Sequence, residues 1–510
     1  MNIKILLSHK YLQSFSNKLL TIIFFLIISS KVASAQDYFK MGCIEQDKAN
    51  LDLAIKDYTK KIAEDPTFTK AYVNRGLCYQ DKAEFDMALK DFKKALELKP
   101  GDPAILMSLG TVYFHQKKFK EALENLEAGL KKAPNNVNAQ YDLGMAKHEL
   151  KDYSGAILAF NVAINMDPNK EKFYYSRALS KDLMRDFRGA MSDCSNAVKL
   201  KPDYEKAYFL RAKEENELQF YKQALEDLEI IIKLSPGNTR YYAEKGDIEF
   251  HIGLLKESIK DCNKAIEINN LYGNPFYTKA LAERDSGLMD SAKVDITKAN
   301  ELFKGKSPLC WVESAKIKMY TGDYKGMIDD CGFALKISSN YSYAKYQKAY
   351  AMAYLGNDTG AIRILNELLT VDNSFAIGYM LLGRLQLLSL NQKEEAKKNF
   401  EMGVKVHSDS TASAYCFAFL NMEAKAENIL NKQIAHYEET GQRIKRRDAF
   451  AELAYVYAIT KDEAKFYKCI STALEKGYAY KSWIEDSPEL DYLRRKSEYM
   501  DLAVKYVLKR

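Results

Sequence analysis

The six histidines of the chain are the first residues to consider for catalysis or metal binding. They are His9, His115, His148, His251, His407 and His436. No two of them form the H-E-x-x-H pattern of zinc hydrolases, and nothing spaces them as metal ligands. We interpret them as scattered helix residues, and we predict no catalytic site, no metal site and no cofactor.

The sequence was also compared with the motifs of phosphate-binding, nucleophilic and calcium sites. Gly305-Lys306-Ser307 resembles the end of a phosphate-binding loop, but Asn300 stands where that loop needs glycine. The sequence contains no G-x-G-x-x-G, no G-x-S-x-G and no calcium loop. We therefore predict that the protein is not an enzyme. An enzyme hidden after residue 409 is the alternative, although those roughly 100 residues show no nucleophile or acid/base cluster.

The eight cysteines are better explained by packing than by disulfide bonds or metal binding. Cys194 and Cys262 occupy one position of a repeat that elsewhere holds Phe92 and Phe160. No pair has the C-x-x-C spacing of zinc or redox sites. Cysteines at equivalent positions two repeats apart are too distant to bridge. We predict buried, free thiols, which are common in protein cores.

The elements that would position any site follow a strict lattice. Six of the ten prolines are spaced 34 residues apart. Two columns of small residues keep the same period, 12 and 24 residues before each proline, and aromatic residues flank both columns. The prolines are Pro66, Pro100, Pro134, Pro168, Pro202 and Pro236, and the small residues are Ala54, Ala88, Ala122, Ala156, Ala190 and Ala224, with Gly42, Gly76, Gly110, Gly144, Ala178 and Ala212. Such a period indicates one structural unit copied along the chain.

The residue types indicate a pair of helices in each copy. A proline ends a helix because it lacks an N–H group and disfavours helical geometry in the residue before it. Small residues allow two helices to cross closely. The pattern of aromatic residue, Gly, Ala, aromatic residue and Pro at this period resembles the tetratricopeptide repeat (TPR) family. The resemblance implies an all-α fold, in which antiparallel helix pairs stack into a right-handed superhelix with a helical C-terminal cap.

The lattice also gives the expected organisation of the chain. A TPR array is expected over residues 36–408, and divergent TPR-like helices with a C-terminal cap over 409–510. An array needs such a cap to cover its last apolar face. The expected repeats are 36–68, 69–102, 103–136, 137–170, 171–204, 205–238, 239–272, 273–306, 308–341, 342–375 and 376–408.

Residues 1–35 have the pattern of a secretory signal peptide. They contain four lysines and no acidic residue, an apolar run from Leu19 to Ile28, and Ala33-Ser34-Ala35 before Gln36. We predict cleavage before Gln36, since the apolar run is shorter than the roughly 20 residues that span a bilayer. An uncleaved membrane anchor is the alternative. The charge without the leader is only +3, which does not favour a nucleic acid as partner.

The resemblance further implies a concave face on which a partner binds. In TPR proteins the fifth residue of each repeat points into this groove, and here that column is mostly apolar or aromatic. Tyrosines recurring every four residues in the tenth repeat extend it. The predicted groove residues are Tyr141, Tyr175, Phe209, Tyr277, Tyr343, Tyr346, Tyr350 and Tyr354. The alternative is that these side chains pack only on neighbouring helices.

The sequence therefore predicts a non-enzymatic scaffold that binds a protein or peptide partner through many weak contacts and a few aromatic anchors. From the leader we expect it in the periplasm or at the surface of a Gram-negative bacterium, as part of an envelope complex, with no stable membrane span after cleavage. The second function considered is glycan binding in the same groove, because aromatic rings can stack on sugars.

Overall fold

The structure is a computed structural model that describes residues 38–439, 442–478, 487–494 and 496–507. The predicted leader, residues 1–35, lies outside these ranges. Every regular element in the described residues is helical, which confirms the all-α prediction. The chain divides into two compact units, unit 1 (Met1–Leu218) and unit 2 (Gln219–Arg510), and each is considered by itself.

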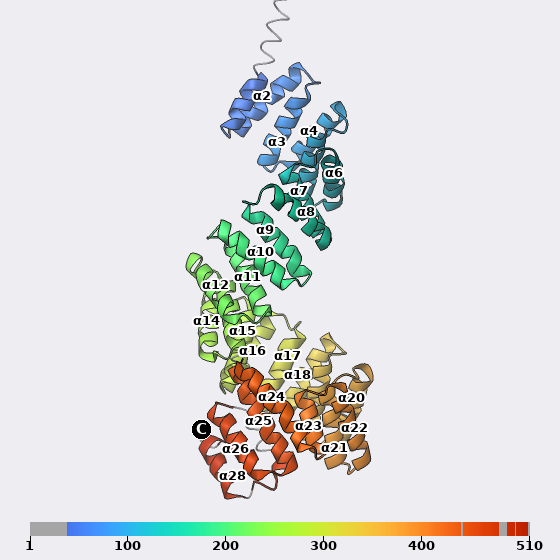
Figure 1. Ribbon diagram of the computed structural model, residues 1–510, viewed down its shortest axis with the longest axis vertical. Helices are drawn as coiled ribbons and strands as arrows, with labels where there is room; N and C mark the ends of the chain where they lie inside the picture. Colours follow the sequence, from blue (N-terminus) through green and yellow to red (C-terminus); the bar gives the residue numbers. More distant parts are fainter. Residues whose placement is uncertain (1–37, 440–441, 479–486, 495, 508–510) are drawn as a thin grey trace, which may run out of the picture. The chain divides into compact units, whose positions relative to one another are not determined.

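Unit 1 is a succession of short helices of similar length that pack in consecutive pairs (Figure 1). Its elements are a helix over residues 38–47, α2 (Leu51–Glu64), α3 (Thr69–Asp81), α4 (Phe85–Leu98), α5 (Pro103–His115), α6 (Phe119–Lys132), α7 (Val137–Glu149), α8 (Tyr153–Met166), α9 (Glu171–Leu183), α10 (Phe187–Leu200) and α11 (Glu205–Glu217).

Unit 2 continues the same alternation and ends in irregular helical pieces. Its elements are α12 (Tyr221–Leu234), α13 (Thr239–His251), α14 (Leu255–Ile268), α15 (Gly273–Asp285), α16 (Met289–Leu302), α17 (Pro308–Tyr320), α18 (Tyr324–Ile337), α19 (Ser342–Tyr354), α20 (Asp358–Val371), α21 (Ala376–Leu388), α22 (Lys393–Val406), α23 (Thr411–Phe419), α24 (Glu423–Glu439), α25 (Arg443–Thr460), α26 (Glu463–Glu475), η1 (Pro488–Leu490), α28 (Ser497–Leu502) and η2 (Ala503–Val507).

Two local signals set the helix ends. The second helix of a pair ends two residues before the lattice proline, as α4 does before Pro100, and Lys99 between them leaves helical geometry with φ −135° and ψ 79°. The first helix ends in a turn with one residue in the left-handed region. Examples are Lys151 in unit 1, with φ 65°, and Gly253 in unit 2, with φ 81°. Glycine adopts this conformation without the steric cost that lysine meets.

The two helices of a pair meet where a small residue faces a larger one 16 positions later. A Cβ atom added to Gly76 would lie 2.8 Å from the ring of Phe92, and one added to Gly144 would lie 2.5 Å from the ring of Phe160. Where alanine replaces glycine, the facing residue is smaller than an aromatic ring. Pairs of this kind include Ala178 with Cys194, Ala280 with Ile296, Ala315 with Cys331 and Ala349 with Leu365. Glycine also faces residues smaller than an aromatic ring, since Gly110 faces Leu126 and Gly246 faces Cys262. At these crossings an aromatic ring thus faces glycine, and alanine stands where the facing residue is smaller.

We expect Gly76→Ala to destabilise the chain because the new methyl group would overlap the Phe92 ring. Overpacking of this kind costs about 1–3 kcal/mol. Phe92→Leu in the same chain should recover part of the loss, since the equivalent pair of Ala349 and Leu365 packs together in unit 2. Thermal unfolding followed by circular dichroism measures both effects.

A control for the added methyl group is Gly332→Ala in α18, where an added Cβ atom meets no atom within 4 Å. It should melt at or slightly above the temperature of the unchanged chain, because alanine favours helix more than glycine does. Equal losses at positions 76 and 332, or no recovery by Phe92→Leu, would contradict the volume argument.

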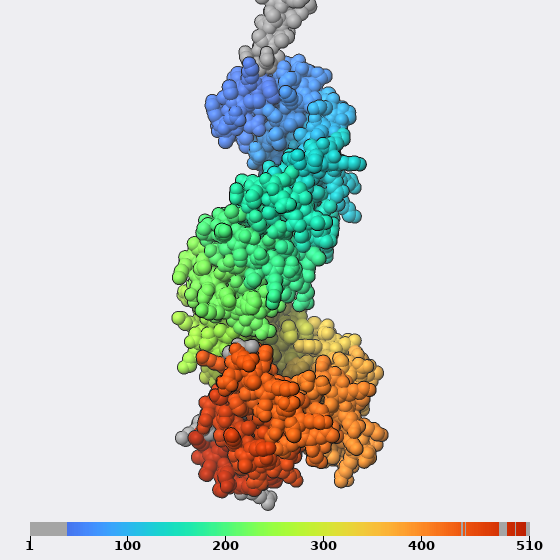
Figure 2. Space-filling model, viewed as in Figure 1, coloured from blue at the N-terminus to red at the C-terminus, as the bar shows by residue number. Residues whose placement is uncertain are grey.

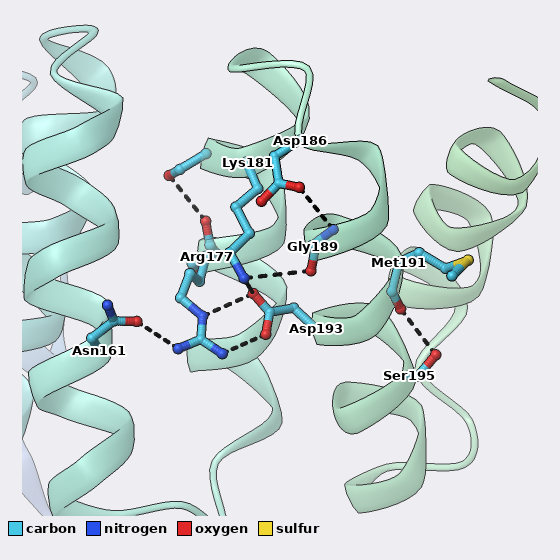
Figure 3. A network of polar contacts seen from close by, with 10 residues as sticks. Asn161, Arg177, Lys181, Asp186, Gly189, Met191, Asp193 and Ser195 are labelled. Atoms are coloured by element: carbon cyan, nitrogen blue, oxygen red, sulfur yellow. Dashed lines mark hydrogen bonds and ion pairs between the residues drawn. The ribbon is translucent and has the colours of Figure 1, made fainter. Parts of the chain in front are cut away.

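Buried ion pairs also join the helices, and Figure 3 shows one such network in unit 1. Arg177 Nε of α9 donates to Asp193 Oδ2 of α10 over 2.8 Å, and Lys181 Nζ lies 2.8 Å from the same oxygen. Arg177 Nη1 also donates to Asn161 Oδ1 of α8 over 2.6 Å. The carboxylate of Asp193 is thus paired by two cations, which offsets the cost of burying its charge.

In unit 2 the position equivalent to Lys181 is acidic, because Glu249 and Glu283 occupy it in two successive repeats. In each of these repeats a glutamate and an aspartate share one lysine. Lys279 Nζ lies 3.0 Å from Asp295 and 3.6 Å from Glu283. Burial, together with the neighbouring Asp261, raises the pKa of Glu249 to about 7. Burial and Asp295 likewise raise the pKa of Glu283 to about 8.

These raised pKa values predict a chain that is more stable in mild acid than in mild base. An unfolded glutamate titrates near pH 4.3, so between about pH 4.5 and 8 the folded chain holds more protons than the unfolded chain, and stability falls as pH rises. The thermal unfolding midpoint should therefore decrease as the pH is raised from 5.5 to 8.5. The Glu249→Gln, Glu283→Gln double variant should lose less over this range, and an unchanged pH dependence would contradict the assignment.

Candidate functional site

Unit 2 contains a cavity of about 600 Å³ on its inner wall. The lining comes mostly from the first helices of successive pairs. The lining residues are Phe250, His251, Arg284, Asp285, Lys316, Met319, Tyr320, Met327, Tyr343, Tyr346, Gln347, Tyr350, Tyr354, Ile377, Met380, Leu381, Arg384, Thr411, Tyr415, Lys445, Asp448, Ala451, Glu452, Tyr455, Tyr478 and Ser487.

The cavity exists because the C-terminal helices return to the start of the unit. Arg447 Nη1 of α25 donates to the carbonyl oxygen of Asp285 in α15 over 2.9 Å, although the two residues are 162 positions apart. Arg384 of α21 is held by Glu489 of η1 through two hydrogen bonds of 2.6 and 3.0 Å. In Figure 2 the orange and red C-terminal residues lie beside the gold surface of the preceding pairs. Within unit 2, the C-terminal helices thus lie against the helix pairs that line the cavity.

One side of the cavity is aromatic. Tyr346, Tyr350 and Tyr354 follow one another along α19, with ring centroids 6.3 and 4.6 Å apart. Across from them, Tyr415 of α23 and Tyr455 of α25 form an edge-to-face pair at 5.1 Å. Burial raises the pKa of the α19 pair Tyr346 and Tyr350, so their hydroxyl groups stay protonated and can donate hydrogen bonds. The wall therefore offers large rigid surfaces with polar tips.

The two arginines of the cavity are paired with carboxylates. Arg284 Nε lies 2.8 Å from Asp285 Oδ1, and its Nη1 is also bonded to Glu313. Burial alone would raise the pKa of Glu489, but the hydrogen bonds from Arg384 lower it below the usual value. Glu489 is thus ionised, and it neutralises Arg384. Neither arginine offers a free charge to an incoming anion.

Glu452 is different, because no basic residue in the described parts of the chain forms an ion pair with it. The hydroxyl of Thr411 donates to Glu452 Oε2 over 3.3 Å. Burial, with the charge of Asp448, raises the pKa of Glu452 to about 7, and only the bond from Thr411 opposes the shift. Asp448, one turn earlier on α25, accepts from Arg447 Nε over 2.8 Å. Glu452 is therefore a half-buried residue whose carboxyl group accepts one hydrogen bond, from a neutral partner, among the described residues.

The predicted groove residues are distributed unevenly. Tyr343, Tyr346, Tyr350 and Tyr354 come together on the cavity wall. Tyr277 lines a second cavity of about 310 Å³, also in unit 2, beside Tyr272 and Asp247.

The other three predicted residues belong to unit 1 and contact neighbouring helices. The Tyr141 ring lies 5.0 Å from that of Phe173, and its hydroxyl is 3.1 Å from Ser176 Oγ. Tyr175 packs on Tyr204 at 5.2 Å, and Phe209 is half-buried. These contacts are of the kind that the packing alternative expects, and a binding role for the whole column stays a prediction.

Sequence reasoning did not find several cavity residues. Arg384, Tyr415, Glu452 and Tyr455 were not singled out, and three of them lie beyond residue 409, where the repeat lattice blurs. A signal was present in α25, because Lys445, Asp448, Glu452 and Tyr455 recur at intervals of three or four and so share one helix face. Reading that face would have required knowing that α25 returns to the inner wall.

Comparison with protein families decides which family the repeats belong to. Models of the tetratricopeptide repeat match residues 69–102, and residues 107–171 and 209–271. The chain is a tetratricopeptide repeat protein. Its lattice of small and aromatic residues, and its consecutive helix pairs, are those of TPR units. A comparison with curated proteins gives no match to this TPR protein.

Solved structures of other TPR proteins resemble parts of this one. Yeast Tom70 is 17% identical, with 81% of this chain and 99% of that chain covered and a TM-score of 0.39. A TPR protein from Parabacteroides merdae is 19% identical, covering 46% and 93% of the two chains with a TM-score of 0.37. YrrB, described as a TPR protein with an unusual peptide-binding site, is 23% identical, covering 35% and 90% with a TM-score of 0.31.

Two general features of the described residues bear on function. No helix among them is both long and apolar enough to cross a membrane. All eight cysteines are free thiols, and all except the half-buried Cys43 are buried. Burial raises the pKa of Cys262 and Cys331 to about 12, so these thiols remain protonated and unreactive at neutral pH.

Proposed function

We propose that this TPR protein is a non-enzymatic scaffold that binds a protein or peptide partner in the aromatic cavity of unit 2. TPR units suggest protein partners in general, and the cavity gives the proposal a location. The observation that carries it is the row of Tyr346, Tyr350 and Tyr354 on α19, whose rings line an accessible space although Tyr346 and Tyr350 also pack on the core. Half-exposed tyrosines are suited to binding, since they bury a large area at little cost in side-chain entropy.

We further propose that the scaffold works in the cell envelope after removal of residues 1–35. The basic residues, short apolar run and Ala33-Ser34-Ala35 of the leader support export. The partner is then a component of the same compartment, with which the scaffold forms an envelope complex. A nucleic acid is not expected, because the charge of the chain without its leader is close to balanced.

The binding proposal predicts that a Tyr346→Ala, Tyr350→Ala double variant loses its partner while remaining folded. The loss of two aromatic anchors at the centre of an interface typically costs about 2 kcal/mol or more. Crosslinking in intact cells, followed by affinity purification and mass spectrometry, identifies the partner of the unchanged chain. The same experiment on the variant measures the loss.

A matched control is Tyr242→Ala in α13, a half-buried tyrosine outside the cavity lining. The control should retain the partner. Retention by the double variant, with unchanged circular dichroism, would show that the cavity is not the binding site.

The export proposal predicts that mature protein begins at Gln36. N-terminal sequencing of material isolated from the envelope fraction measures the start directly. Protein that keeps Met1, or that is found only in the cytoplasm, would contradict the proposal.

A further inference from the structure

Glu452 is half-buried on the cavity wall, where an ionised carboxyl group is costly unless a cation approaches it. Among the described residues, Thr411 donates one hydrogen bond to this carboxyl group, over 3.3 Å. A carboxylate removed from water needs a counter-charge to be stable in its ionised form. The described part of unit 2 places no basic group in an ion pair with it.

The basic residues that line the cavity are either paired with other carboxylates or form no described ion pair with Glu452. Arg384 is held by Glu489, and Arg284 by Asp285 and Glu313. Lys445 is exposed to solvent. Lys316 is half-buried, and its charge acts on Asp448. The described residues of the cavity therefore leave Glu452 without an ion pair.

Aromatic rings line the same cavity as Glu452. Tyr415 is close enough that the charge of Glu452 contributes to its raised pKa, after the larger effect of burial. Tyr455 follows Glu452 by three residues on α25, and Tyr346 and Tyr350 line the facing side of the same cavity. Tyrosine ring faces attract cations, most strongly where water is excluded. A ring of tyrosines with one carboxyl group is chemically suited to an ammonium or guanidinium group.

We propose that this cavity takes up a lysine or arginine side chain of the bound peptide, with Glu452 as its counter-charge and Tyr346, Tyr350 and Tyr415 as its walls. This inference rests on the proposed function and specifies what the cavity recognises. The apolar stem of the side chain contacts the rings and Met380, and its charged end reaches the carboxylate of Glu452. The ligand supplies a positive charge that no described residue places in an ion pair with Glu452.

The test uses the full chain and four capped peptides, acetyl-Gly-Gly-Xaa-Gly-Gly-amide, in which Xaa is lysine, arginine, norleucine or glutamate. Isothermal titration at about pH 8, where a carboxyl group of pKa near 7 is ionised, gives the dissociation constants. The lysine and arginine peptides should bind at least about tenfold more tightly than the norleucine peptide, which is the usual strength of a charge-assisted hydrogen bond to a buried group.

Glu452→Gln should abolish this preference while leaving the fold intact, because the amide oxygen can still accept the bond from Thr411. The control is Glu367→Gln in α20, an exposed glutamate outside the cavity, which should keep the preference. Circular dichroism shows that each variant is folded. Should Glu452→Gln not fold, Thr411→Val provides a second variant that leaves the carboxylate in place, and it should keep the preference for lysine over norleucine.

Several outcomes would overturn the inference. They are equal binding of the lysine and norleucine peptides, tighter binding of the glutamate peptide, no saturable binding of the lysine peptide, or a preference unchanged in Glu452→Gln. The proposed function fails separately, if the Tyr346→Ala, Tyr350→Ala variant keeps its cellular partner. If the cavity binds the cellular partner but Glu452→Gln has no effect on peptide preference, only the inference about Glu452 is rejected.

Discussion

Contact between a small residue and a larger one 16 positions later is the constraint on which the helix pairs depend. Gly76 lies so close to Phe92 that no Cβ atom fits between them, and Ala178 appears where Cys194 replaces a ring. This contact sets the distance between the two helices of a pair, and the 34-residue period repeats it. Because this crossing holds the two helices of a pair together, the residues on the other faces of the first helix can differ from repeat to repeat.

In unit 2 the first helices of several pairs line a cavity, and α19 carries tyrosines on that side. A hydrogen bond from Arg447 to the Asp285 carbonyl oxygen holds α25 against α15 beside this cavity. The ion pair of Arg384 with Glu489 anchors the C-terminal segment to the same wall, 105 positions away. The segment expected to cap the array therefore also shapes the proposed binding site.

The sequence predicted the helices well because their signals are local. Prolines, turn residues and the columns of small residues lie within one repeat of the elements they define. The tyrosines of α19 were also found, since they recur every four residues. Glu452, Tyr415 and Arg384 were missed because their roles depend on contacts between distant helices, and the lattice fades after residue 409. The sequence pattern does not show the boundary between units 1 and 2, because the proline spacing continues unbroken from Pro202 to Pro236.

The central claim is that the partner contacts the inner wall of unit 2 and not its outer surface. A photo-reactive amino acid in place of Tyr346, on the cavity wall, or of Glu367, exposed on α20, tests this directly in living cells. Irradiation should crosslink the same discrete partner through position 346 and not through position 367. Crosslinking of that partner only through position 367 would contradict the account.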